Sequence, residues 1–346
     1  MNNITNNQNL SYYNQRFAVV GNGNYFTPGR EIWVNRIRSR GFEAKGFDDF
    51  ESFKEYNPTC VIVFGITQHP KPNDRKKIWV AIQTEHFYHP KTGGIHHTPQ
   101  WLKKSLPLLK AYDIIMDFSR TNIDAIERSG KKLRKKNILL HPLCSLGEFS
   151  VCTNSAIEKE YDILFIGWHS RIAGSPYSRR GIILEELMKK YKLYPLSNDL
   201  WGEEKQKAIR QSKICLNLHY EESRFIEIER MLDYSANHAF IMSDRIFDST
   251  PFVDGEDYVS FFLTDLEDRI DYYLSHDEER QKIADHAFQK VKQLSEDSGA
   301  VDLVLDAVLL EADRKNYPRE MRSWRRRRLR YRIYKHLPEK IRDKIM

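Results

Sequence analysis

Short apolar runs alternate with helix-length segments along the first half of the chain. The run FAVVG at 17–21 ends in glycine and indicates a buried strand. A helix is expected next, with Thr27 as its N-cap, Pro28 as its first residue and Gly41 at its end. The run FEAKGF at 42–47 follows, and further strands are predicted within 60–65, 78–87, 112–118 and 137–143, with a helix over 121–133. This alternation predicts a parallel sheet of about five strands with helices on its faces.

The second half of the sequence repeats this alternation. Strands are predicted within 161–167, 212–220, 238–244 and 258–262, and helices over 179–191, over 226–237 and within 264–294. We therefore expect an α/β protein with two Rossmann-like, doubly wound domains, 16–150 and 151–315. Residues 1–15 are expected to form a disordered leader, and 316–346 a basic amphipathic tail.

Length and composition agree with two folded domains. The chain has 346 residues, 40% of them hydrophobic and 12% aromatic, which is too much apolar content for a disordered protein. No apolar run approaches the roughly 20 residues that cross a bilayer, and the N-terminus lacks the apolar core of a signal peptide. A cytoplasmic location is therefore expected. The four cysteines form no C-x-x-C pair and are expected to be reduced thiols.

An unusual density of charge separates two of the predicted strands. The stretch HYEESRFIEIER at 219–230 follows one strand and enters the next helix, and ligands of open parallel sheets bind at such strand ends. Glu221 and Glu229 have an E-x7-E spacing, and carboxylates can accept hydrogen bonds from the vicinal hydroxyls of a sugar or a ribose. The alternative is structural, with Glu227 and Glu229 complementing the helix dipole while Arg230 pairs with Glu227.

Cations are predicted at neighbouring positions. Arg179 and Arg180 lie at the start of the helix over 179–191, where backbone N–H groups favour phosphate. Lys213 opens the strand that leads to His219. Phosphate-binding cations beside hydroxyl-binding carboxylates are the combination that a nucleotide-sugar requires.

Several segments resemble a known family. In the second half these are DILFIG, RRGIILEEL, SKICLNLHY, IEIERMLDYSANHAFIMSDR and the stretch from FVDGEDYVSFF to IADHA; in the first half they are IQTEHF, YDIIMDFSRTN and ILLHPL. In this order and spacing they resemble GT-B glycosyltransferases, and most closely the CgeB-type, glycosyltransferase family 1-like branch. The resemblance implies two Rossmann-like domains facing across a cleft, with a nucleoside-diphosphate sugar on the second domain and an acceptor on the first. It also implies sugar transfer, of the hexosyltransferase type, with no bound metal and no other cofactor.

Site residues follow from the resemblance. Glu227 and Arg230 match a Glu-x-x-Arg at the helix start, while Glu221 and Glu229 match the more widespread E-x7-E, and the two alignments compete. The turn Ala-Cys-Gly that often follows this helix is replaced by the longer DYSANHA. The predicted donor-binding residues are Arg179, His219, Glu221, Arg224, Glu227, Glu229 and Arg230.

Catalytic roles are assigned by electrostatics. Arg180 and Lys213 are predicted to stabilise the charge that develops on the leaving diphosphate. If the reaction inverts the anomeric configuration, a general base is expected from the first domain, with Glu85 or His86 as candidates. The alternative for both is that QTEHF only shapes an acceptor loop.

Two further signals have weaker interpretations. GNGNYF at 21–26 is an incomplete dinucleotide fingerprint, because Phe26 stands where the third glycine belongs, and a turn or acceptor-side role is favoured. The histidines at 86, 89, 96 and 97 lie in a loop-like stretch with no cysteine and no defined ligand spacing, so a loop is favoured over a zinc site.

The C-terminal tail carries the basic character of the chain. Of the formal net charge of +7, residues 322–346 contribute +9, so that the other 321 residues sum to −2. Apolar residues recur every four positions among the arginines, a pattern that suits an anionic membrane surface. Nucleic-acid phosphates or packing on its own domain are the alternatives. Membrane contact would agree with a lipid-linked or surface-polysaccharide acceptor; other glycans or a protein remain open, as does a non-catalytic GT-B-like binding protein or a nucleic-acid-modifying one.

Overall fold

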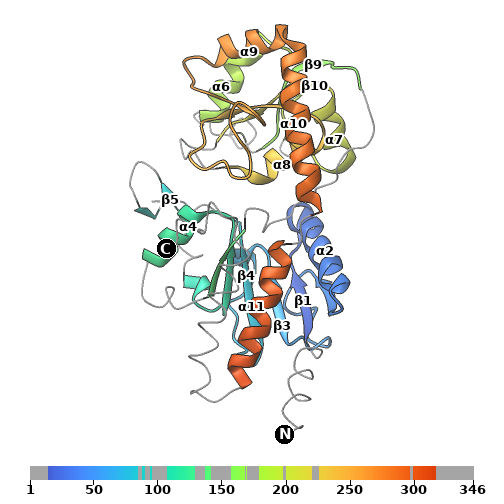
Figure 1. The fold of residues 1–346 in the computed structure, drawn as a ribbon, viewed down its shortest axis with the longest axis vertical. Coiled ribbons are helices and arrows are strands. Elements are labelled where there is room, and N and C mark those ends of the chain that lie inside the picture. Colours follow the sequence, from blue (N-terminus) through green and yellow to red (C-terminus); the bar gives the residue numbers. More distant parts are fainter. Residues whose placement is uncertain are drawn as a thin grey trace. The chain divides into compact units, whose positions relative to one another are not determined.

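A computed structural model describes residues 15–84, 88–89, 94–95, 107–128, 137–141, 157–167, 169, 179–197, 200–219, 226–296 and 299–316. These residues form two compact units (Figure 1). The first combines described residues up to 84, from 107 to 141, and from 299 to 316; the second contains those from 157 to 296, together with the small hairpin of β5 (Tyr88–His89) and β6 (Gly94–Ile95). Two α/β units in succession confirm the predicted fold class.

The first unit is built on a six-stranded sheet in the order β2-β1-β3-β4-β7-β8, in which every pairing is parallel. Its strands are β1 (Arg16–Val20), β2 (Glu43–Phe47), β3 (Cys60–Val63), β4 (Ile78–Gln83), β7 (Ile114–Asp117) and β8 (Asn137–Leu140). Central β3 and β4 are buried at every position, as expected for strands covered on both faces. The helices are α2 (Gly23–Ser39), α4 (Arg120–Arg128) and α11 (Gly299–Asn316), with a 3₁₀ turn at Ile66–Gln68.

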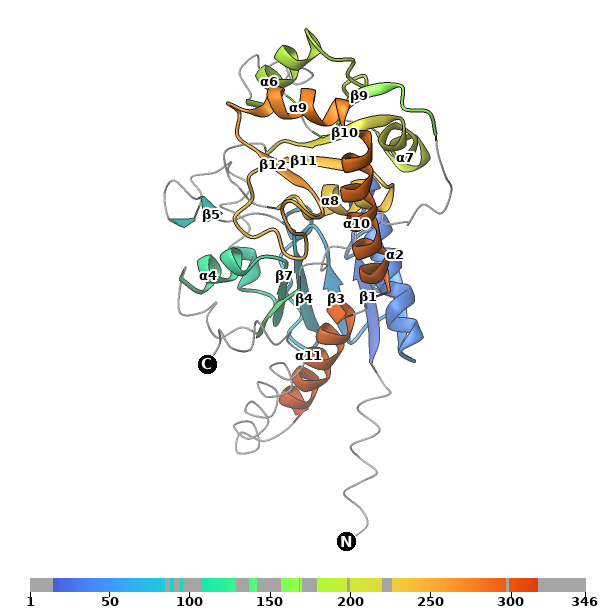
Figure 2. The ribbon, with the colours of Figure 1, turned by 45° about the horizontal axis from the view of Figure 1, so that its top comes forward.

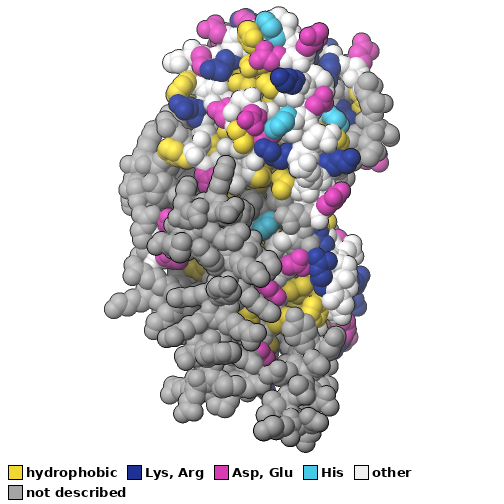
Figure 3. All heavy atoms as spheres, in the orientation of Figure 1, with side chains coloured by type: hydrophobic (Ala, Val, Ile, Leu, Met, Phe, Trp, Pro, Cys, Tyr) yellow, Lys and Arg dark blue, Asp and Glu magenta, His cyan; other side chains and the backbone are white. Residues whose placement is uncertain are grey.

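The second unit has a four-stranded parallel sheet in the order β12-β11-β10-β9. Its strands are β9 (Tyr161–Phe165), β10 (Ser212–Asn217), β11 (Phe240–Asp244) and β12 (Val259–Phe261). Figure 2 shows α6 (Arg179–Met188) and α9 (Leu266–Ser275) on one side of this sheet and α8 (Ile228–Ala236) on the other; α7 (Gly202–Arg210) and α10 (Asp277–Ser295) complete the unit. Charged side chains of both signs are mixed over the face seen in Figure 3.

Two sequence-based boundaries were wrong. Helix α2 begins at Gly23, five residues before Pro28, so Thr27 lies inside the helix and is not its cap. The larger correction concerns α11, most of which falls inside the bounds 151–315 predicted for the second domain. In the structure α11 packs on α2, β4, β7 and β8 of the first unit.

The contacts of α11 explain this placement. Val301, Val304 and Val308 are fully buried, one turn apart along the helix. Asp302 accepts two hydrogen bonds from Arg40, from Nε at 2.8 Å and from Nη2 at 2.9 Å. At the other end Lys315 Nζ donates to the Lys77 carbonyl at 2.6 Å and to Asp113 Oδ2 at 3.2 Å. An apolar stripe with a polar anchor at each end therefore fixes the helix to the first sheet.

We predict that Val304→Ala destabilises the first unit selectively. Removing two buried methyl groups and leaving a cavity should cost about 2 kcal/mol. Hydrogen exchange should then accelerate in peptides of β4 and β7 and stay unchanged in β10. Val253→Ala is the matched control, because Val253 is 44% exposed and lies in the second unit. Equal acceleration in both units would contradict the assignment of α11.

Candidate functional site

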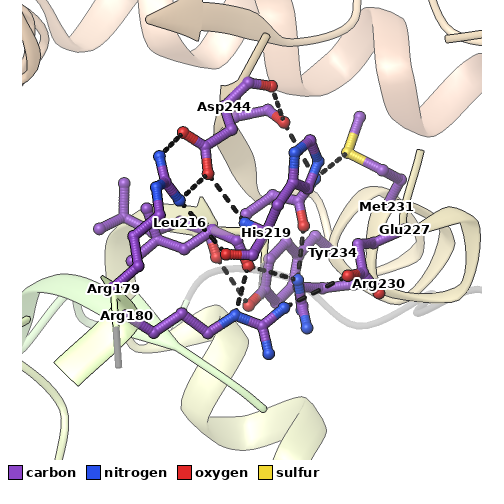
Figure 4. A network of polar contacts seen from close by, with 12 residues as sticks. Arg179, Arg180, Leu216, His219, Glu227, Arg230, Met231, Tyr234 and Asp244 are labelled. Atoms are coloured by element: carbon purple, nitrogen blue, oxygen red, sulfur yellow. Dashed lines mark hydrogen bonds and ion pairs between the residues drawn. The ribbon is translucent and has the colours of Figure 1, made fainter. Parts of the chain in front are cut away.

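Polar side chains from four elements meet at the carboxyl edge of the second sheet (Figure 4). They come from the start of α6, the end of β10, the start of α8 and the end of β11. Parallel strands bring their carboxyl ends to one edge, which is why residues distant in the sequence come together here.

Asp244 connects three of these elements. Its Oδ1 accepts a hydrogen bond from Arg179 Nη2 at 2.6 Å, and its Oδ2 accepts one from Arg179 Nη1 at 2.7 Å and another from the His219 backbone N–H at 2.8 Å. Arg179 Nη1 also reaches the His219 carbonyl at 3.2 Å. The Arg179 and Asp244 side chains are 19% and 10% exposed, so this two-pronged ion pair is largely shielded from water.

Arg180 points into the unit from the same end of α6. Its Nε donates to the Leu218 carbonyl at 2.7 Å and its Nη2 to Glu227 Oε1 at 3.2 Å. Burial and, to a lesser extent, the neighbouring positive charge of Arg230 lower the pKa of Arg180 to about 10. The guanidinium remains charged at neutral pH, and it is only 4% exposed.

Arg230 approaches from α8 and is more open to solvent. Its Nη1 donates to Asn217 Oδ1 at 2.6 Å and, more weakly, to the Leu218 carbonyl at 3.4 Å. Asn217 is in turn held by Ser243, whose Oγ accepts from Asn217 Nδ2 at 2.9 Å. Gly167 leaves room for this arginine: its φ is +143°, and a Cβ there would lie 2.8 Å from Arg230 Nη2.

The two guanidiniums share one aromatic ring. The central carbons of Arg180 and Arg230 each lie 5.4 Å from the centroid of the Phe165 ring, within cation–π range. Beneath them, the buried Tyr234 hydroxyl donates to the Leu216 carbonyl at 3.3 Å and accepts from the Ile166 N–H at 3.2 Å. Two positive charges are thus held side by side at the ends of β9 and β10, with Glu227 as the carboxylate that pairs with Arg180.

The structure separates Lys213 from this site, and the role predicted for it was wrong. Lys213 is the second residue of β10, and its Nζ pairs with Asp162 Oδ1 at 3.0 Å near the start of β9. At roughly 3.3 Å per strand residue, this amino edge lies on the order of 13 Å from Asn217. A cation in the first residues of a strand lies at the amino edge of the sheet, opposite to the carboxyl edge where the strand ends.

The other predicted residues divide into two groups. Glu227 is the residue before α8, and Glu229 lies in its first turn; His219 is buried at the end of β10. Glu227 and Arg230, the possible i,i+3 pair, contact other residues. Glu227 accepts a hydrogen bond from Arg180, and Arg230 donates one to Asn217. Glu85, His86, Glu221 and Arg224 lie outside the described residues, as does the tail at 322–346.

Sequence reasoning missed Asp244, Asn217 and Phe165. All three close an apolar strand run, at the end of IMSD, of ICLN and of DILF. A polar residue at the last position of a buried strand was therefore the usable signal. Phe165 carried no such signal, since an aromatic residue in a strand ordinarily indicates core.

The first unit also has a polar group at the carboxyl edge of its sheet. Asp117 ends β7 and is fully buried, and its Oδ1 accepts from the Ser119 N–H at 2.8 Å and from Asn122 Nδ2 at 3.2 Å. Desolvation raises the pKa of this carboxyl to about 8 in spite of these donors. Gln83, 1% exposed, is its neighbour on β4.

Metal-ligand clusters and membrane spans were sought in the described residues. They contain no group of three or more His, Cys, Asp or Glu side chains that could hold a metal ion. No helix among them combines the length and apolar character needed to cross a membrane.

Comparison with known proteins identifies the fold. Residues 155–295 match a family described as glycosyl transferase-like, and a comparison with curated proteins gives no significant match. Among solved structures, Anabaena Alr3699/HepE in complex with UDP and glucose is similar with a TM-score of 0.53 and 8% identity, over 81% of this chain and 95% of that one. HepE in complex with UDP-glucose gives a TM-score of 0.52 and 7% identity, over 87% of this chain and 99% of that one.

TarM is similar with a TM-score of 0.50 and 10% identity, over 75% of this chain. The chain spans only 57% of the length of TarM. Together these likenesses show the GT-B glycosyltransferase fold, as the sequence predicted, with the glycosyl transferase-like family match confined to the second unit. The assignment to the CgeB-type branch stays a prediction.

We predict that Asp244→Asn destabilises the second unit by about 3 kcal/mol. The amide loses the charge and turns an N–H group toward Arg179, so a shielded guanidinium is left without its counter-ion. Urea unfolding would measure the loss. Asp277→Asn is the control, since Asp277 is 81% exposed beside Arg280 and its pair should contribute less than about 1 kcal/mol. Equal effects of the two variants would refute the structural role of Asp244.

We also predict a pH-dependent stability that depends on Asp117. Its pKa is raised from 3.8 to about 8 on folding, so the unfolded chain ionises first and the free energy of unfolding falls as the pH rises between these values. Asp117→Asn should flatten this fall in urea titrations between about pH 4 and pH 8. Asp124→Asn, at a partly exposed position of α4, should leave it intact. An unchanged profile in Asp117→Asn would contradict the prediction.

Proposed function

We propose that this protein is a glycosyltransferase that transfers a sugar from a nucleoside-diphosphate sugar to an acceptor. The observation that carries the proposal is the pair of guanidiniums, Arg180 and Arg230, that share the Phe165 ring at the carboxyl edge of the second sheet. The glycosyl transferase-like match covers these residues, and the GT-B fold agrees with it.

The electrostatics of this edge favour a diphosphate. Two like charges close together repel each other, and the groups that hold them are mainly neutral acceptors, Asn217 Oδ1 and the Leu218 carbonyl. Among the described residues, Glu227 offers a full counter-charge to Arg180, with its Oε1 3.2 Å from Arg180 Nη2. An anion bound beside Arg230 would relieve the repulsion and gain charge-assisted hydrogen bonds.

The chemistry follows from this charge. When the bond between the anomeric carbon and the diphosphate oxygen breaks, both electrons stay on that oxygen, and the negative charge of the diphosphate grows. Arg230, the more open of the two arginines, would bind it directly. Arg180 is more than nine-tenths buried, so we assign it two roles: it orients Glu227, and it adds positive potential from inside the second unit.

Hydroxyl recognition is proposed for the start of α8. Glu227 is about one-third exposed and keeps acceptor capacity beyond its contact with Arg180, so it could receive the hydroxyls of a ribose. Glu229, with Glu221 as its partner in the alternative alignment, is the second candidate. The acceptor hydroxyl would lose its proton to a base from the first domain, for which Glu85 and His86 stay the candidates.

The finer assignments are also proposals. We propose a hexosyl group as the transferred sugar, no metal in catalysis, and a glycan or lipid-linked acceptor of polysaccharide synthesis. Peripheral attachment to the inner membrane surface through 322–346 would bring the enzyme to such an acceptor.

A thermal-shift panel of UDP, GDP, dTDP, ADP and CMP with EDTA present tests the donor site. A nucleotide at about 100 times its Kd should stabilise the fold by roughly 2.7 kcal/mol, which is visible as a rise in Tm. We expect one nucleoside diphosphate to stand clear of the others. UDP is the first choice to examine, because HepE structures hold UDP with glucose and UDP-glucose.

Two variants test whether nucleotide binding depends on the carboxyl edge of the second sheet or on positive charge elsewhere on β10. Arg230→Met should abolish the shift, because the guanidinium proposed to contact the diphosphate is lost. Lys213→Met removes the same charge at the amino edge of β10 and should leave the shift unchanged. A flat panel for the native protein would overturn the proposed function and favour a non-catalytic or nucleic-acid-binding role.

A further inference from the structure

A second feature of the same edge lies beside Arg179 and His219. A pocket of about 230 Å³ opens between the start of α6 and the ends of β11 and β12. Its lining includes Arg179, Asp244, Arg245, Phe262, Leu263 and Thr264. We call it the Arg245 pocket. Known ligand pockets for drug-sized molecules hold roughly 300–1,000 Å³, so this one suits a single ring and not a whole nucleotide-sugar.

The pocket presents an aromatic and an aliphatic side chain to solvent. Phe262 is 50% exposed and Leu263 is 48% exposed, whereas the preceding Phe261 is buried in the core. The contrast arises because β12 ends at Phe261, and the residues that follow leave the sheet. Exposed apolar side chains at the mouth of a pocket give a flat surface against which a ring can pack.

Arg245 is fixed on this surface. Asp244 of β11 pairs with Phe261 of β12, so the next residues on the two strands, Arg245 and Phe262, also lie side by side. The guanidinium carbon of Arg245 sits 4.7 Å from the centroid of the Phe262 ring. Stacking of this kind orients a planar cation while leaving its N–H groups at the rim of the ring.

The charge of Arg245 differs from that of its neighbour. Arg179 is neutralised by the carboxylate of Asp244. Within the part of the chain that the structure describes, Arg245 is exposed and makes no ion pair, and its partner is the Phe262 ring. Within the described residues, the pocket therefore carries one positive charge without an ion pair next to an apolar surface, and the Thr264 hydroxyl also lines it.

We propose that the Arg245 pocket is a subsite for one anionic monosaccharide unit, a sugar that bears a carboxylate or a phosphate. Arg245 would bind the anion through two parallel N–H bonds, while the ring of the sugar packs on Phe262 and Leu263. The proposal rests on the proposed function, because it assigns a sugar to this edge. The anionic unit comes either from the donor or from the end of the acceptor.

Isothermal titration of the full chain distinguishes the two sources. The first arm compares UDP, UDP-glucose and UDP-glucuronate; the matching nucleotide replaces UDP if the thermal-shift panel selects another base. The second arm titrates glucuronate, glucose 6-phosphate and neutral glucose into protein saturated with the nucleoside diphosphate. If the donor is anionic, UDP-glucuronate should bind about 10- to 100-fold more tightly than UDP-glucose, as expected for a charge-assisted hydrogen-bonded pair. If the acceptor is anionic, the charged free sugars should bind and glucose should not.

Variants tie either preference to the pocket. Arg245→Gln should reduce the ratio of the affinities for the anionic and the neutral sugar to about 1, and Arg245→Lys should keep part of the preference. The affinity for the nucleoside diphosphate alone should stay unchanged in both variants. Phe262→Leu should lower the affinity for charged and for neutral sugars by a similar factor. Lys189→Gln removes an equal charge from the opposite end of α6, where the side chain is 68% exposed, and should change nothing.

The outcomes separate this inference from the proposed function. Nucleotide binding without any preference for an anionic sugar would overturn the Arg245 pocket and leave the glycosyltransferase proposal standing. A preference that survives in Arg245→Gln would also overturn it. Absence of nucleotide binding in the native protein would overturn the proposed function itself.

Discussion

The organisation of the second unit depends on one carboxylate, that of Asp244. It receives both terminal nitrogens of Arg179 and the backbone N–H of His219, and so it connects α6, β10 and β11. Fixing the start of α6 directs the next residue, Arg180, into the unit. Fixing the end of β10 presents the Leu218 carbonyl to that arginine. A shielded ion pair contributes little net free energy by itself, but losing one member is costly, so the pair acts mainly to hold a geometry.

This geometry leaves more positive than negative charge among the described residues around the Phe165 ring. Arg180 pairs with Glu227, and both Arg180 and Arg230 are further oriented by the Phe165 ring and by neutral acceptors, the Leu218 carbonyl and the Asn217 amide. On the other side of Arg179, Arg245 is likewise oriented by an aromatic ring. Stacking on an aromatic ring thus orients a guanidinium at two places on this edge.

Much of this arrangement could be predicted from the sequence, because the spacing of apolar residues indicates which positions are buried. All the strands predicted for the second unit are present, and the carboxyl edge of its sheet was correctly taken as the place where Arg179, His219 and Glu227 meet. The failures have separate causes. Lys213 was assigned from its charge and its strand, whereas a strand of six residues separates its two ends by more than a side chain can reach. Nothing in the sequence indicated that Asp244, 65 residues away in β11, forms an ion pair with Arg179.

The sequence by itself determined the α/β class, the two successive units and the edge where the charges gather, since each follows from local pattern and from the geometry of parallel strands. Only the tertiary structure decided which charges are neutralised and which stay open, because that depends on side chains brought together from distant strand ends. It also decided that α11 belongs to the first unit. A helix pattern shows that one face must be buried but not against which sheet, and Val301, Val304 and Val308 find theirs after the chain has passed through the whole second unit.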